Sequence, residues 1–212
     1  MPAPRIKICG VTNAATVEAC IASRADYLGF NFCPPSPRFL PLPAARELGV
    51  QARGRIGRVG LFVDADPAAI AEAVAAADLD AIQLHGGETP ETVSRLKAQH
   101  GLPVWKVVSV AGAADLAATD RYAPVADLIL LDAKTPKGSL AGGLGLKFDW
   151  SLLAGWKAPG PWGLAGGLNP GNVAEAVRIT GAPLVDTASG VESAPGVKDV
   201  DRIAAFCKAA RS

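Results

Sequence analysis

The sequence contains few of the residues that most often form metal sites and disulfide frameworks. It has only two histidines, and its four cysteines, at positions 9, 20, 33 and 207, show neither CxxC spacing nor neighbouring histidines. Zinc sites combine these ligands at short spacings, and disulfide frameworks belong mainly to small secreted domains. We therefore expect no metal site and no disulfide framework.

Charge and hydropathy exclude further classes. The 21 basic and 20 acidic residues are scattered, with a net charge of +1 and no block of like charges, whereas nucleic-acid binding normally requires a basic surface. No apolar run reaches the ~18 residues of a membrane span, and the polar N-terminus shows no signal peptide. We expect no nucleic-acid partner, no membrane association and a cytoplasmic location.

The chain is long enough for one sizeable core. It has 212 residues, half of them apolar and only 19% charged, and its mean hydropathy is +0.24. Disordered chains combine low hydropathy with high charge, and two independent domains would need a longer chain. We expect residues 1–212 to form a single domain.

Short aliphatic and β-branched runs recur along the chain, each followed by enough residues for one helix and its return. They are RIKIC from residue 5, YLGFNF from 27, RVGLFV from 58, AIQLH from 81, VWKVV from 104, DLILLD from 127, PWGLAGG from 161 and PLVDTA from 183. Eight strand–helix units favour an α/β fold closed as a (β/α)₈ TIM barrel. An open, doubly wound parallel sheet is the alternative.

The segments between these runs carry helix signals. Three of them begin with a capping residue followed by proline: Asp66–Pro67, Thr89–Pro90 and Asn169–Pro170. Helices are predicted to end at Gly101 and Gly181, because glycine is the preferred residue after a helix. In the final helix, apolar residues share one face: Val200, Ile203, Phe206 and Cys207.

Active residues of such a barrel follow the carboxyl ends of its strands. AGGLNPGN, with Gly166 and Gly167, follows the seventh run, and DTASGVE, with Ser189 and Gly190, follows the eighth. Backbone N–H groups of both loops could converge on a phosphate. Either loop alone could be a simple turn, but the two together favour a phosphate site.

The first and sixth runs would flank this corner of a closed barrel. The first ends in Cys9 and the sixth in Asp132, so a substrate held by its phosphate would lie between a thiol and a carboxyl group. Such a pair is suited to general acid–base catalysis. Cys9 could also be a space-filling core residue.

Lys7 is expected to point into the barrel with Cys9, because alternate residues of a strand face the same side. A free thiol has a pKa near ~8.5 and is mostly protonated at neutral pH. We propose that Lys7 lowers the pKa of Cys9. Alternatively, Lys7 pairs with Asp186 and serves only folding.

The ordered motifs resemble the phosphoribosylanthranilate isomerase family of tryptophan biosynthesis. They are KICGVT, LGFNFCPPSPR, QLHGGE, LLDAK, GGLGLKFDW, GLAGGLNPGNV and VDTASGVESAPGVKD. The resemblance implies an Amadori rearrangement of a small phosphorylated substrate, N-(5-phosphoribosyl)anthranilate, without metal or organic cofactor. By motif position, Asp132 would be the general acid that opens the sugar ring, and Cys9 the base that removes the C2′ proton.

The resemblance also assigns the substrate-binding residues. Arg38 would hold the anthranilate carboxylate, and Asp186 would lie near the substrate nitrogen. Backbone phosphate contacts would come from Gly166, Gly167, Ser189 and Gly190. The loop GGLGLKFDW departs from the family in having Leu144 and Leu146 where polar residues are usual, which leaves backbone contacts from Gly142 and Gly143.

Other residues and readings stay open. No catalytic role follows for His85, and structural roles are favoured for Cys20, Cys33 and Cys207. Another phosphate-binding barrel isomerase or epimerase, or a binding barrel without turnover, remains an alternative, although such isomerases usually pair two aspartates. The oligomeric state could be monomer or homodimer.

Overall fold

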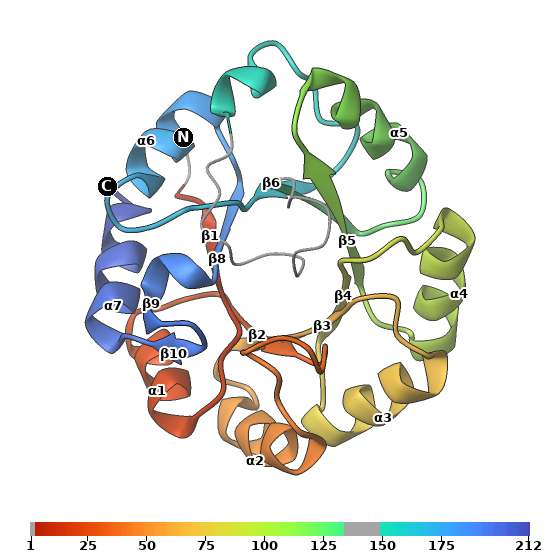
Figure 1. Ribbon diagram of the computed structural model, residues 1–212, viewed down its shortest axis with the longest axis vertical. Helices are drawn as coiled ribbons and strands as arrows, with labels where there is room; N and C mark the ends of the chain where they lie inside the picture. Colours follow the sequence, from red (N-terminus) through yellow and green to blue (C-terminus); the bar gives the residue numbers. More distant parts are fainter. Residues whose placement is uncertain (1–2, 134–148) are drawn as a thin grey trace.

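Eight parallel strands close into a barrel in the order of the chain (Figure 1). The computed structural model describes residues 3–133 and 149–212. The strands are β1 (Arg5–Cys9), β2 (Tyr27–Asn31), β3 (Gly57–Phe62), β4 (Ala81–Leu84), β5 (Val104–Val110), β6 (Leu128–Ala133), β7 (Trp162–Leu164) and β8 (Leu184–Thr187). Each predicted run forms one of them, so the barrel prediction is confirmed and the open-sheet alternative is wrong.

Helices surround the barrel on the outside (Figure 1). The α-helices are α1 (Ala14–Ala22), α2 (Leu42–Ala52), α3 (Pro67–Ala77), α4 (Pro90–His100), α5 (Ala118–Tyr122), α6 (Val173–Thr180) and α7 (Val200–Ala209). Shorter elements are the 3₁₀ segments η1 (Ala113–Ala117), η2 (Trp150–Leu153) and η3 (Ser189–Val191), and the hairpin of β9 (Glu192–Ala194) and β10 (Val197–Lys198). Among the described residues, no helix has the length and apolar character needed to cross a membrane.

Local capping chemistry sets several helix ends as predicted. The Asp66 side chain accepts a hydrogen bond from the N–H of Ala68, and Thr89 accepts one from Thr92. Gly101 ends α4 with φ +63°, a left-handed conformation that glycine adopts easily. Because these signals depend on neighbours in the chain, they could be read without the fold.

Two details of the predicted helices are wrong. Helix α6 begins at Val173 rather than after Asn169, because Asn169 accepts a hydrogen bond from Gly171 N–H and donates its own N–H to the Asn172 side chain. These bonds close a turn before the helix. In α7, Val200 is 46% exposed, although the other three residues predicted on its apolar face are buried.

The strands separate two apolar layers. Ile6 and Ile8 lie in the larger cluster between the barrel and the helices. A smaller cluster fills the inside of the barrel and contains Val59, Ala81, Trp105, Val107, Leu128, Leu130, Ala165 and Leu184. The alternation predicted for β1 is therefore confirmed, since Lys7 and Cys9 lie on the inner side.

Inside the barrel, Lys7 forms an ion pair with Asp186 on the neighbouring strand β8. Its Nζ donates to both carboxylate oxygens at 3.0 Å, and the lysine has no exposure to solvent. Burial alone would lower the pKa of Lys7, but the charges of Asp186 and Cys9 raise it above its ordinary value. Lys7 is therefore held in its charged form.

We predict that Lys7→Met strongly destabilises the barrel, because Asp186 would keep a buried carboxylate without its cation. Breaking a buried pair in this way costs about 3–5 kcal/mol, which urea unfolding would measure. The double variant Lys7→Met/Asp186→Asn should recover most of that loss, because it removes both charges. A loss below about 1 kcal/mol for Lys7→Met would contradict this account.

Candidate active site

A cavity opens at the carboxyl ends of the strands and brings together most of the predicted site residues. It is lined by Cys9, Asn31, Arg38, Leu61, Gln83, His85, Leu130, Asp132, Ala165, Gly166, Gly167, Leu168, Asp186, Thr187, Ala188 and Ser189. Both polar and apolar side chains line it. The cavity thus has the usual position of an active site in this fold.

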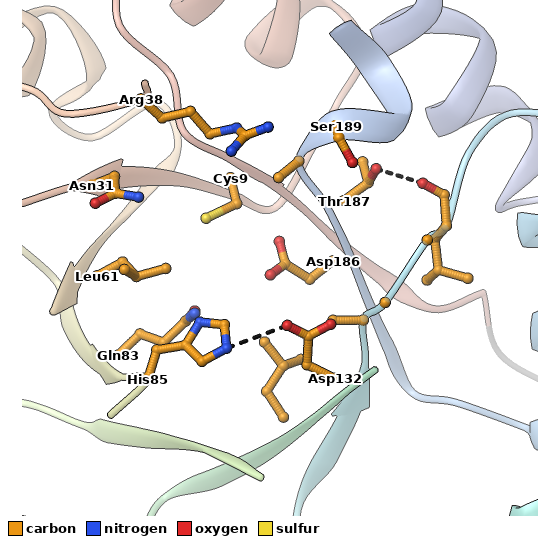
Figure 2. Close-up of a pocket in the computed structure, with 16 residues that line it drawn as sticks. Cys9, Asn31, Arg38, Leu61, Gln83, His85, Asp132, Asp186, Thr187 and Ser189 are labelled. Carbon is orange, nitrogen blue, oxygen red and sulfur yellow. Dashed lines mark hydrogen bonds and ion pairs between the residues drawn. The ribbon is translucent and has the colours of Figure 1, made fainter. Parts of the chain in front are cut away.

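Cys9 and Asp132 face the same cavity from different strands. Cys9 is the last residue of β1 and Asp132 the penultimate residue of β6. Figure 2 shows the thiol and the carboxylate on opposite sides of Asp186. The neighbouring order β6, β7, β8, β1 that follows from closure is also present. A ligand between Cys9 and Asp132 would therefore meet a proton-transfer group on each side.

Burial dominates the titration of Cys9. The pKa of this thiol is raised above its ordinary value because burial disfavours the thiolate, while the positive charges of Lys7 and Lys198 oppose the increase. Lys7 therefore acts in the predicted direction, but it does not produce a net decrease. The alternative expectation, that Lys7 pairs with Asp186, is confirmed.

His85 lies beside Asp132, a contact that the sequence did not reveal. Its Nε2 is 3.3 Å from Asp132 Oδ2 (Figure 2). The other ring nitrogen, Nδ1, is buried without a hydrogen-bond partner in residues 3–133 and 149–212. A ring in this place can hold the Asp132 carboxyl in position and exchange a hydrogen bond with it.

The loop after β7 is shaped by two glycines in left-handed conformations. Gly166 has φ +85° and Gly167 φ +70°, and a Cβ on Gly166 would lie 2.5 Å from the backbone nitrogen of Ala133. The Gly167 carbonyl accepts a hydrogen bond from the Asn172 side chain at 3.0 Å. These constraints direct the glycine-rich backbone toward the cavity.

The loop after β8 packs tightly against the loop after β7. Thr187 Oγ1 donates to the Leu168 carbonyl at 2.7 Å, and a Cβ on Gly190 would lie 1.9 Å from that same oxygen. Ser189 lines the cavity, whereas Gly190 is absent from the lining residues. Sequence reasoning gave Thr187 no role, because its contact is with another loop rather than with a neighbour in the chain.

Arg38 lines the cavity and is already held by a carboxylate of the protein. Its Nε and Nη2 donate to the two oxygens of Glu192, both at 2.7 Å. Burial alone would raise the pKa of Glu192, but Arg38 and Lys198 lower it below its ordinary value. The sequence reasoning missed Glu192, although VDTASGVE ends with this residue.

Two predicted contacts cannot be placed. Gly142 and Gly143 lie outside the described residues, as do Leu144 and Leu146. Within the described ranges, no group of three or more His, Cys, Asp or Glu side chains is arranged to hold a metal ion.

Comparison with known proteins agrees with the fold. Residues 6–209 match the family model of N-(5′-phosphoribosyl)anthranilate isomerase. The isomerase of that name from Paramagnetospirillum magneticum is 54% identical, over 97% of this chain and 96% of that one.

Two solved structures extend the comparison. The phosphoribosylanthranilate isomerase from Thermotoga maritima superposes with a TM-score of 0.88 at 37% identity, covering 98% of both chains. Another structure of such an isomerase contains reduced 1-(o-carboxyphenylamino)-1-deoxyribulose 5-phosphate, and it has a TM-score of 0.86 at 35% identity, again covering 98% of both chains. The chain therefore belongs to the phosphoribosylanthranilate isomerase family.

Proposed function

We propose that Cys9 and Asp132 carry out the isomerisation of N-(5′-phosphoribosyl)anthranilate in this cavity, as general base and general acid. The observation that carries the proposal is the presence of both residues in one cavity, on opposite sides of Asp186 (Figure 2). General acid–base steps need positioned groups that give and take protons at different atoms of the substrate. The product is 1-(2-carboxyphenylamino)-1-deoxyribulose 5-phosphate.

Asp132 and Cys9 each catalyse one proton transfer of this rearrangement. Asp132 donates a proton to the furanose ring oxygen as its bond to C1′ breaks, and the anilino nitrogen supplies the electron pair that forms the C1′=N Schiff base. The Cys9 thiolate then removes the proton from C2′. The electrons of that C–H bond return toward nitrogen and give an enolamine, which tautomerises to the ketone as C1′ gains a proton and the C2′ hydroxyl loses one.

Binding groups surround these two residues. Backbone N–H groups of Gly166, Gly167, Ser189 and Gly190 are proposed phosphate donors, supported for the first three by their place in the cavity lining. Asp186 would lie near the substrate nitrogen. Arg38 would bind the anthranilate carboxylate, since a guanidinium group suits a carboxylate in both charge and shape.

The cellular location is also a proposal. All four cysteines are free thiols, three of them buried, and the substrate is a small phosphorylated metabolite. Both features support a reaction in the reducing cytoplasm, where thiols persist.

The central test is turnover of N-(5′-phosphoribosyl)anthranilate, followed by loss of its anthranilate-type fluorescence. Cys9→Ala and Asp132→Ala should each reduce kcat by about 10²–10⁴-fold, as expected for removal of a general acid or base. Cys33→Ala is the matched thiol control and should keep its rate, because Cys33 does not line the cavity. An inactive wild type, or full rates in both variants, would refute the proposal.

The raised pKa of Cys9 predicts a specific pH dependence. Thiolate forms as pH rises, so alkylation of Cys9 by iodoacetamide in the unliganded protein should be half-maximal above the ordinary thiol value of about 8.5. The value of kcat/KM should also increase with pH through the neutral range. Mass analysis of the Cys9 peptide separates this thiol from Cys33. A midpoint near pH 7 would contradict the dominance of burial.

A further inference from the structure

Glu192 is the centre of a buried cluster of charged side chains beside the cavity. Its Oε1 accepts hydrogen bonds from Arg38 Nε at 2.7 Å and from Lys198 Nζ at 2.6 Å. Its Oε2 accepts from Arg38 Nη2 at 2.7 Å and from Gly196 N–H at 3.2 Å. One carboxylate therefore receives four donors, and two of them come from the same guanidinium group.

The two-point contact fixes the orientation of Arg38. Arg38, Glu192 and Lys198 are only 8%, 6% and 8% exposed, so an unpaired charge here would be costly. A single hydrogen bond would let the guanidinium plane turn, whereas two parallel bonds define that plane.

The cluster also connects two parts of the cavity. Lys198 Nζ donates a second hydrogen bond to the Ala188 carbonyl at 2.9 Å, and Ala188 precedes Ser189 in the lining. The β9–β10 hairpin presses against the loop that carries Arg38, since a Cβ on Gly196 would lie 2.4 Å from the Pro37 carbonyl. Figure 1 shows this hairpin on the β8–β1–β2 side of the barrel.

We propose that Glu192 is a positioning residue that holds Arg38 ready for the substrate carboxylate, and that Lys198 links it to the backbone at Ala188. This inference rests on the proposed role of Arg38. Such an arrangement lets the substrate bind without first ordering a flexible arginine, so its loss should weaken binding more than it slows the chemical step.

The variant Glu192→Asp tests the proposal, because it keeps the charge and withdraws the carboxylate by one methylene group. A misplacement of about 1 Å can change a rate or affinity 10²-fold, so we expect KM to increase at least about tenfold and kcat to change by less than about threefold. Affinity for the reduced product analogue should decrease by a similar factor. Glu192→Gln should have a larger effect and reduced stability.

A double-mutant cycle distinguishes positioning from general stabilisation. In an Arg38→Ala background, Glu192→Asp should change KM by less than about twofold, because its effect acts through Arg38. Glu18→Asp is the matched control, since Glu18 also accepts two hydrogen bonds from one guanidinium group, from Nη1 and Nη2 of Arg55 on the exposed surface, at 2.7 and 2.8 Å. Its KM should be unchanged.

Each result has a distinct meaning. An unchanged KM in Glu192→Asp, or effects of Glu192→Asp and Arg38→Ala that simply multiply, would overturn the positioning role. A wild type without turnover would refute the proposed function instead.

A different observation concerns the buried amide oxygen of Gln83. Gln83 is 1% exposed and lines the cavity from β4, and its Oε1 has no hydrogen-bond partner in the part of the chain that the structure describes. Figure 2 shows Gln83 near His85, with Leu61 on the neighbouring strand. A buried amide oxygen without a hydrogen bond is energetically unfavourable. A ligand that donates a hydrogen bond to Gln83 Oε1 would therefore remove this cost.

The chemistry of the substrate indicates which part supplies that donor. An ionised carboxylate and a phosphate dianion only accept hydrogen bonds. The donors of N-(5′-phosphoribosyl)anthranilate are its sugar hydroxyls and its anilino N–H, which belong to the reacting centre. We infer, given the proposed function, that Gln83 binds the central part of the substrate through one of these groups.

The variant Gln83→Met tests this inference, because it has a similar size and forms no comparable hydrogen bond. The unliganded protein should become more stable, by about 2–4 °C in melting temperature, while kcat/KM decreases about tenfold. A purely structural glutamine would not give opposite changes. Gln83→Leu provides a second variant.

Unchanged kcat/KM in both Gln83 variants would overturn the inference. A parallel loss of stability and activity would do so too, because it would show that the glutamine supports the fold. Again, an inactive wild type would count against the proposed function and not against Gln83 alone.

Discussion

The ammonium group of Lys7 lies inside the barrel without access to solvent, and its charge must be balanced there. Asp186 supplies the balance from the adjacent strand, in direct register with Lys7. The pair joins the first and last strands of the barrel. Lys7 and Cys9 are alternate residues of β1, so the pair and the thiol lie on the same inner side of the strand. Burial of charge thus shapes both the closure of the barrel and the electrostatics of the cavity.

The need to balance a buried positive charge recurs around the mouth of the barrel. Lys106, on the side of β5 that faces the helices, is paired with Glu88 at 3.0 Å and donates to the Gly86 carbonyl at 2.8 Å. Glu192 neutralises part of the charge of Arg38 and Lys198. Each buried cation therefore has an acceptor fixed by another strand or loop, as the cost of desolvation requires. Two of these cations, Lys7 and Lys198, lower the pKa of the Cys9 thiol against the opposing effect of burial.

Much of the fold could be predicted because its signals are local. Runs of β-branched residues and capping pairs such as Thr89–Pro90 act within a few residues, so they identify strands and helix ends directly. Asn169 was misleading, because its side chain bonds within a turn and the helix starts later. Arg38 and Glu192 are 154 positions apart, and no local pattern identifies such a pair.

The site was predicted only in part, because many of its contacts join residues that are far apart in the sequence. Strand order placed Cys9 and Asp132 around one corner, and the family motifs named their roles. The net effect of burial on the pKa of Cys9 depends on the packing around the thiol, which a sequence does not supply. Likewise, the proximity of His85 to Asp132 depends on the relative position of β4 and β6, two strands that are not neighbours.

Closure of the barrel has a consequence for synthesis of the chain. β1 pairs with β8 through residues 5–8 and 184–187. This pairing can therefore form only after β8 has been synthesised. Until β8 has been synthesised, the ammonium group of Lys7 stays hydrated and the thiol of Cys9 has no enclosed pocket. The enclosed cavity, the buried Lys7–Asp186 pair and the β1–β8 seam of the sheet therefore all depend on β8, and a nascent chain lacking β8 holds no complete site.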